Sequence, residues 1–442
     1  MSRNSRWVRA SRFQRSRIAF VIALPLGQSA LAQGATWGEF RASSDNSGAL
    51  PGNLEVRWDV PIGQAVRAPP VSDKILIAGA DQTGQVTAKE LSSGRVIWRR
   101  RVPTSVHNDP LIGDSTVVVT FGDLPKETSP AGALGFDLHT GRVLWQYATK
   151  GPLMPSGALI GDVVVLLASD GCVHGIGLRD GLVRFRACFD SWAAMSNPKR
   201  VGGQVFLGTT DGHVVCIDGA TGEARWIRRL PLVEHAGDET VAISPGALFI
   251  AGTSWNGYRI LFRDTTFWAG VRIMLDAYVH DRFADRHTLF ARQSVTRLST
   301  ESGEVIWSTQ ISSGRRVLRN QGGTAALWNN LVIVASPVGF NLSALFSADG
   351  RTAWVATLPS QPRSVPTVVG EAVFVGLASG ELLGFGIRDG VLRGRCRWPG
   401  AFTPGAPLVV GKTFIYGASD GVLRAVPLRA IEARMRAGSA CT

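Results

Sequence analysis

The chain has 442 residues and a formal net charge of +13, from 47 Lys and Arg against 34 Asp and Glu. Only 18% of its residues are charged, whereas Gly (51) and Trp (13) are abundant. This composition is typical of many short strands joined by tight turns and argues against a helical or disordered chain. Basic residues do not cluster among aromatic ones, which disfavours nucleic-acid binding.

The N-terminus has the features of a secretory signal. Six arginines and no acidic residue precede an apolar run at 18–26 that is too short to span a bilayer, and Ala-Leu-Ala at 30–32 suits a cleavage site. We predict a signal peptide over 1–32 and a location in the periplasm, with an uncleaved anchor as the alternative. Removing the six arginines leaves a net charge of +7. No cysteine lies directly after the apolar run, where a lipoprotein would carry one, so lipid attachment is not predicted, and no later segment resembles a transmembrane helix.

A glycine followed four residues later by an aromatic residue recurs along the chain. Glycine permits positive φ and closes a hairpin between antiparallel strands. The aromatic residue then lies at a fixed place on an outer strand, where its ring is expected to pack against the next blade. Gly390 keeps the turn but is followed by Gly394 where Trp is expected. The predicted pairs are Gly94 and Trp98, Gly141 and Trp145, Gly181 and Phe185, Gly222 and Trp226, Gly303 and Trp307, and Gly350 and Trp354.

Each of these turns is preceded by an apolar hairpin with its own Gly, Asp or Asn turn. The hairpins and outer strands together give units of four strands in about forty residues, which is typical of propeller blades. We therefore predict an all-β fold, an eight-bladed β-propeller of four-stranded antiparallel blades over 54–430, with a lead-in at 33–53 and a tail at 431–442. The inner hairpins are 71–79, 110–120, 158–168, 200–208, 242–252, 326–335, 367–376 and 408–417.

The final unit predicts how the ring is closed. Residues 404–428 supply three strands, whereas residues 54–58 precede the first blade and end in Trp58, which resembles the outer-strand aromatic residues. We expect this N-terminal strand to complete the last blade. Closure within one chain favours a monomer.

One stretch does not fit the repeat. Gly222 and Gly303 lie 81 positions apart, about two repeat lengths. The excess, about 255–293, is either an insertion or a degenerate ninth blade, and its lack of hairpin glycines favours an insertion. Its aromatic side chains either form a surface for a protein partner or pack the insertion onto the propeller. The candidates for this partner surface are Trp255, Tyr258, Phe267 and Trp268.

The same stretch holds two histidines and two aspartates, residue types that can ligate a metal ion. Their spacing matches no known ligand pattern, and neighbouring arginines favour surface ion pairs, so no metal is predicted. These residues are His280, Asp281, Asp285 and His287.

The five cysteines are an odd number, so at least one is unpaired within the chain. Cys172 and Cys188 are equidistant from the turn at Gly181, which is compatible with a cross-strand disulfide and equally with two separate buried thiols. Cys216 is expected to fill the core. Cys396 and Cys441 have no evident partner. There is no CxxC motif and no pair of adjacent cysteines.

The repeat resembles the PQQ-like (quinoprotein-dehydrogenase-type) β-propeller repeat, in which Thr-Gly precedes a docking Trp. Thr140-Gly141 and Thr221-Gly222 match that turn, and residues 36–48 resemble the Trp-x-x-Phe-Arg lead-in of such proteins. The resemblance spans nearly all of the mature chain. It implies the propeller fold and leaves the activity open.

The family has two branches with different functions. The catalytic branch holds a quinone against a disulfide of adjacent cysteines beside a calcium ion, and this chain has no adjacent cysteines. We therefore predict no cofactor, no metal and no catalytic residue. The branch resembling BamB implies a non-enzymatic scaffold that binds protein partners in the cell envelope, in outer-membrane protein assembly. A PQQ-dependent or related propeller oxidoreductase is the alternative function, and a ligand-binding propeller of the cell surface is a third.

Overall fold

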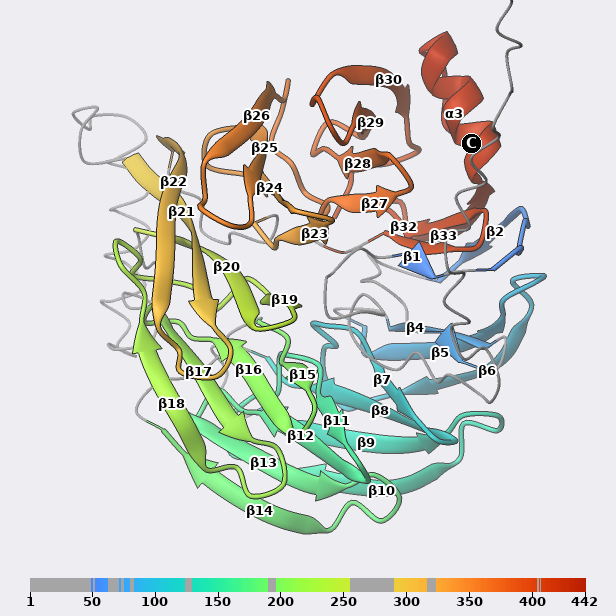
Figure 1. Ribbon diagram of the computed structural model, residues 1–442. Coiled ribbons are helices and arrows are strands. Elements are labelled where there is room, and N and C mark those ends of the chain that lie inside the picture. The colour runs from blue at the N-terminus through green and yellow to red at the C-terminus, as the bar shows by residue number, and fades with distance from the viewer. Residues whose placement is uncertain are drawn as a thin grey trace, which may run out of the picture. The chain divides into compact units, whose positions relative to one another are not determined.

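The computed structural model describes residues 49–50, 52–62, 71–72, 75–79, 83–123, 129–189, 196–254, 290–315, 323–403, 405 and 407–442. All of them belong to one compact unit, which spans residues 36–442. This unit is an all-β β-propeller built from four-stranded antiparallel blades, as the repeat predicts (Figure 1).

The described residues form seven four-stranded blades and one five-stranded sheet, so the prediction of eight four-stranded blades is wrong. In chain order, these are the first to the seventh blade. They comprise β3–β6 (Val71–Ser72, Ile75–Gly79, Gln85–Glu90, Val96–Arg101), β7–β10 (Leu111–Gly113, Thr116–Phe121, Gly132–Asp137, Val143–Ala148), β11–β14 (Ala158–Ile160, Val163–Leu167, Cys172–Gly177, Val183–Cys188), β15–β18 (Lys199–Val201, Gln204–Gly208, His213–Asp218, Ala224–Arg229), β19–β22 (Ala242–Ser244, Ala247–Thr253, Phe290–Ser299, Val305–Arg315), β23–β26 (Ala326–Trp328, Leu331–Ser336, Asn341–Phe346, Thr352–Thr357) and β27–β30 (Thr367–Val369, Ala372–Gly376, Glu381–Gly386, Leu392–Arg397).

The five-stranded sheet joins the two ends of the propeller, and we call it the closing sheet. Its order is β1-β31-β32-β33-β2, in which β2 pairs antiparallel with β33 and places Trp58 opposite Ala425. The expected completion of the last sheet by the N-terminal strand is confirmed. The fifth strand arises because β1 pairs in parallel with β31. The strands are β1 (Ala49–Leu50), β31 (Leu408–Val410), β32 (Thr413–Gly417), β33 (Val422–Pro427) and β2 (Trp58–Pro61).

The core consists of apolar layers between neighbouring sheets. Successive side chains of a strand point to opposite faces, so a strand with both faces covered is apolar throughout. In β12, Val164 and Leu166 pack toward the second blade, whereas Val165 and Leu167 pack toward the fourth. This double burial explains why the inner hairpins carry continuous apolar runs.

The irregular stretch interrupts the fifth blade between its second and third strands. β20 pairs with β21 over seven residue pairs, from Ala247 and Ser299 to Thr253 and Gln293. The four strands of this blade therefore come from both sides of 255–289. Those residues, which include nearly all of the predicted insertion or ninth blade, lie outside the described residues.

The C-terminal residues form a helix, which the sequence did not indicate. Helix α3 (Leu428–Ala437) follows β33 directly and ends at Gly438, whose φ is 65°. Its buried residues, Leu428, Ile431 and Met435, share one face of the helix. In the described part of the chain, no helix is both long and apolar enough to cross a membrane.

Candidate functional site

The predicted aromatic residues form the joints between neighbouring sheets. The indole of Trp98 lies on Gly141 of the next blade, where a Cβ atom would come within 2.6 Å of Trp98 Cδ2. Trp98 Nε1 donates a hydrogen bond of 2.8 Å to the carbonyl of Leu138, three residues before that glycine. Five more tryptophans make both contacts, and Phe185 makes the ring contact alone. The pairs are Trp58 on Gly94, Trp98 on Gly141, Trp145 on Gly181, Phe185 on Gly222, Trp226 on Gly303, Trp307 on Gly350 and Trp354 on Gly390.

Local hydrogen bonds hold each glycine in position to receive the ring. In the second blade, Asp137 Oδ1 accepts hydrogen bonds from the Thr140 backbone N–H (2.8 Å) and hydroxyl (2.6 Å). These bonds lower the pKa of Asp137. Gly141 follows, and its φ is 66°. This backbone conformation is unfavourable for residues that carry a Cβ atom. The turn therefore requires glycine for two reasons: its φ is positive, and a Cβ atom at this position would clash with the Trp98 ring.

Gly394 of β30 stands where the other outer strands carry an aromatic residue, because β30 packs against helix α3 rather than against a glycine turn of the next sheet. The closing sheet takes its outer strand from β2, so α3 follows β33 where the usual turn would stand. A Cβ atom on Gly394 would lie 2.8 Å from Met435 Cβ and 3.0 Å from the Met435 carbonyl oxygen. Glycine therefore lets the helix approach β30.

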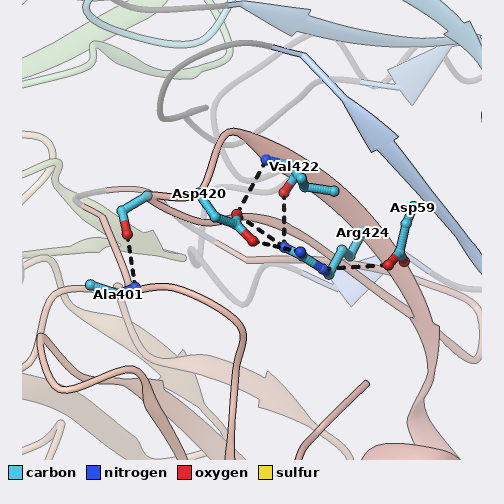
Figure 2. Close-up of polar contacts among 6 residues, drawn as sticks. Asp59, Ala401, Asp420, Val422 and Arg424 are labelled. Atoms are coloured by element: carbon cyan, nitrogen blue, oxygen red, sulfur yellow. Dashed lines mark hydrogen bonds and ion pairs between the residues drawn. The ribbon is translucent and has the colours of Figure 1, made fainter.

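A buried arginine reinforces the closing sheet (Figure 2). Arg424 of β33 is 7% exposed, and its guanidinium binds Asp420, with Nη1 3.0 Å from Oδ1. Its Nε lies 3.5 Å from Asp59 Oδ2 on β2. Asp420 Oδ1 also accepts a hydrogen bond of 3.2 Å from the Val422 N–H. Arg424 thus connects the final turn with the N-terminal strand.

Two disulfides are present, and sequence reasoning anticipated one as a candidate. Cys172 and Cys188 face each other across β13 and β14, with Cα atoms 4.0 Å apart and sulfurs bonded. The second disulfide joins Cys396 of β30 to Cys441, beyond α3. No local pattern indicates this disulfide, because its cysteines are 45 residues apart and meet only after α3 docks. Cys216 is free and buried, and burial raises its pKa to about 12.

A chain of buried polar side chains connects the segments that precede the first strands of four blades. Asn197 Nδ2 donates to Asn108 Oδ1 (3.4 Å), and the Asn197 N–H donates to the Thr240 hydroxyl (3.2 Å). The Thr240 N–H donates to the Thr324 hydroxyl (3.1 Å). Because buried polar groups need partners, these bonds fix the relative positions of the second, fourth, fifth and sixth blades.

Lys89 is a buried cation in the first blade. It is 0% exposed, and no described residue accepts a hydrogen bond from its Nζ. Val86 and Ala88 of the same strand pack toward the second blade, so alternation directs Lys89 to the opposite face. Burial, and secondly the charge of Arg99, lowers the pKa of Lys89 to about 8.

The outer strands of the third and fourth blades each expose apolar and basic side chains, and we call this set of residues the outer-strand surface. Leu182, Val183 and Ile227 are 62%, 53% and 48% exposed. β14 and β18 are the outer edges of their sheets, and Phe185 brings the two blades into contact. The surface comprises Leu182, Val183, Arg225, Ile227 and Arg229.

The predicted partner residues Trp255, Tyr258, Phe267 and Trp268 lie outside the described residues, as do the histidines and aspartates considered as metal ligands. Within the described ranges, no group of three or more His, Cys, Asp or Glu side chains could hold a metal ion.

Two characterised proteins resemble the chain over most of its length. Tetrathionate hydrolase from Acidithiobacillus ferrooxidans is 22% identical over 398 residues, covering 82% of this chain and 72% of the hydrolase. The outer membrane protein assembly factor BamB of Yersinia pestis is 21% identical over 388 residues, covering 83% of this chain and 87% of that protein.

The fold also matches a solved structure. The crystal structure of BamB from Moraxella catarrhalis superposes with a TM-score of 0.62 at 18% identity, covering 83% of this chain and 95% of that one. The sequence model of the family described as "Outer membrane protein assembly factor BamB" matches residues 51–230 and 291–434, thus both sides of the irregular stretch. The chain therefore belongs to the outer membrane protein assembly factor BamB family.

Proposed function

We propose that the protein is a non-enzymatic scaffold of the cell envelope that binds a protein partner in outer-membrane protein assembly. The observation that carries this proposal is the outer-strand surface, where exposed Val183 and Ile227 lie on neighbouring edge strands. Family membership supports the assembly role.

The partner is expected to present an extended segment. An edge strand offers unpaired backbone N–H and C=O groups to such a segment, and neighbouring side chains then select the sequence. On β18, Ile227 supplies apolar contact, and Arg229 supplies a positive charge beside it. Arg225 is paired with Asp218 at 2.7 Å, so its charge is partly neutralised. An apolar segment with an acidic residue suits this surface.

The test compares matched aspartate substitutions in the full-length protein. Ile227→Asp places a carboxylate in the outer-strand surface, whereas Val355→Asp changes a similarly exposed residue (55%) on the outer strand of the sixth blade. Affinity purification from envelope extract, quantified by mass spectrometry, is expected to recover outer-membrane assembly proteins with wild type and Val355→Asp. Because one interface anchor is lost, we expect Ile227→Asp to recover about tenfold less of these proteins, with an unchanged melting temperature. Equal recovery with both variants would contradict the proposed surface.

An enzymatic role is the second candidate, and the similarity to tetrathionate hydrolase favours it. Incubation of the folded protein with tetrathionate would reveal hydrolysis as substrate loss. Incubation with PQQ and calcium, followed by absorbance and dye reduction, tests the quinone-dependent alternative. Turnover in either assay would replace the scaffold proposal.

We also propose that the working protein is a periplasmic monomer that begins at Gln33 after removal of 1–32. In this division, residues 33–53, which include β1 of the closing sheet, lead into the propeller at 54–430, and residues 431–442, which include most of α3, form the tail. The mass of the protein recovered from the periplasm and its size in solution check these points.

A further inference from the structure

The two disulfides differ in their access to solvent. Cys188 is exposed on the outer strand β14, whereas its partner Cys172 is 4% exposed on β13. In the other disulfide, Cys396 and Cys441 are 3% and 1% exposed. A thiolate attacks one sulfur of a disulfide and displaces the other, so access to at least one sulfur is required. Cys188 is the only exposed residue among the four bonded cysteines, so we expect an incoming thiolate to reach the disulfide there.

The electrostatic surroundings distinguish the two sulfurs of the exposed disulfide. Arg186 Nη2 donates a hydrogen bond of 2.9 Å to Cys172 Sγ. Asp170 positions this corner: its Oδ2 lies 3.7 Å from Arg186 Nη2, and its Oδ1 accepts a hydrogen bond of 3.0 Å from the Cys172 N–H. A neighbouring guanidinium stabilises a thiolate, and a stabilised thiolate is the better leaving group. Cys172 Sγ is therefore the better leaving group of the two sulfurs.

The neighbouring blade shields the same corner. Cys172 and His174 lie on one face of β13, and Ile176 of that face packs into the layer shared with the second blade. Tyr147 of the second blade places its hydroxyl 2.8 Å from His174 Nδ1. An external thiol therefore meets Cys188 on the exposed strand before it can reach Cys172.

We infer that the Cys172–Cys188 disulfide is a thiol–disulfide exchange site for low-molecular-weight thiols. The incoming thiolate attacks Cys188 Sγ and forms a mixed disulfide there, while the bond to Cys172 breaks and Cys172 keeps the electron pair as a thiolate. The incoming thiol is thereby oxidised and Cys172 reduced. Attack by the Cys172 thiolate on the mixed disulfide reverses the reaction and releases the small thiol.

The experiment uses glutathione and the full chain with both disulfides formed. After acid quenching and alkylation, peptide mass spectrometry locates glutathione and free thiols. We expect glutathione on Cys188 and an alkylated Cys172, with Cys396–Cys441 intact as an internal control. Exposure and charge predict that the first disulfide reacts at least about tenfold faster than the second. Equal rates, no adduct, or an adduct on Cys172 would overturn the inference.

Two variants separate the charge of Arg186 from a purely structural role. Arg186→Gln is expected to slow formation of the adduct by roughly three- to tenfold, because the leaving thiolate loses its cation. Arg186→Lys restores the charge and is expected to recover most of the rate. Arg184→Gln is the matched control, since Arg184 lies on the same strand and pairs with Asp180 at 2.8 Å. A rate unchanged in Arg186→Gln, or lowered equally in Arg184→Gln, would remove the proposed role of Arg186.

Discussion

Trp58 lies on Gly94: a Cβ atom on that glycine would come within 2.7 Å of Trp58 Cδ2, and Trp58 Nε1 donates a hydrogen bond of 2.9 Å to the Leu91 carbonyl. This contact joins the closing sheet to the first blade. It repeats the geometry of the other aromatic joints with a residue that precedes the first blade in the chain but belongs to the closing sheet. The closing joint therefore uses the same interaction as the joints within the repeat.

Replacing Trp58 by Ala should destabilise the propeller strongly. The substitution removes a buried indole and its hydrogen bond, so we expect the free energy of unfolding to fall by about 3–5 kcal/mol. Urea denaturation followed by fluorescence measures the change. Trp328→Ala is the control, because Trp328 is partly exposed and its ring contacts Arg388, 5.1 Å away. A loss at Trp58 no larger than that at Trp328 would show that the joint does not secure closure.

Gly394→Ala should weaken the docking of helix α3. The added Cβ atom would lie 2.8 Å from Met435 Cβ, so the helix must shift, at a cost of about 1–3 kcal/mol. Gly203→Ala is the matched control, since a Cβ atom there meets no atom within 4 Å. Thermal unfolding and proteolysis near the C-terminus compare the two variants. Identical stability for both would mean that α3 adjusts without cost.

Lys89→Met should stabilise the protein at neutral pH. The pKa of Lys89 is lowered from 10.5 to about 8, so the folded state opposes protonation. Below pH 8 Lys89 is protonated in both the folded and the unfolded state, so the folded protein bears the full cost of burying the charge. Between pH 8 and 10.5 the unfolded state binds more protons, so stability rises with pH.

The shift corresponds to at most about 3 kcal/mol at pH 7, and Lys89→Met should recover about 1–3 kcal/mol of it. Urea unfolding at pH 7 and pH 10 measures both effects. Relative to the wild type, Lys89→Met should raise the free energy of unfolding more at pH 7 than at pH 10. An equal gain at both values would attribute the effect to packing rather than to charge.

Asp420→Ala should cost more stability than Asp59→Ala, although both carboxylates contact Arg424. The Asp420 side chain is 28% exposed and binds two guanidinium nitrogens, so its removal leaves a buried cation poorly paired. We expect a loss of about 1–3 kcal/mol. The Asp59 side chain is 54% exposed, and solvent screening limits its loss to about 0.5 kcal/mol. Chemical denaturation measures the loss of stability in each variant. A larger loss in Asp59→Ala than in Asp420→Ala would show that Asp59 makes the main ion pair with Arg424.

The repeat itself was readable from the sequence because its determinants are local. Gly141 and Trp145 belong to one hairpin, and their spacing specifies both the turn and the strand position of the ring. The role of Trp58 was also readable, because the last unit lacked an outer strand and the first segment supplied one. Even Cys172 and Cys188 could be considered together, since their symmetry about one turn places them opposite each other.

Other features depended on contacts between distant parts of the chain. The pairing of Cys396 with Cys441, and the glycine at 394, follow from α3 docking on β30, which no local pattern encodes. The fifth strand of the closing sheet likewise requires β1 to meet β31. The spacing of residues along the chain is enough to specify the repeating blade and its aromatic joint, because both are set by hairpin geometry. The number of four-stranded blades and the contacts at the closing sheet depend on ring closure, because closure brings together segments that lie far apart in the chain.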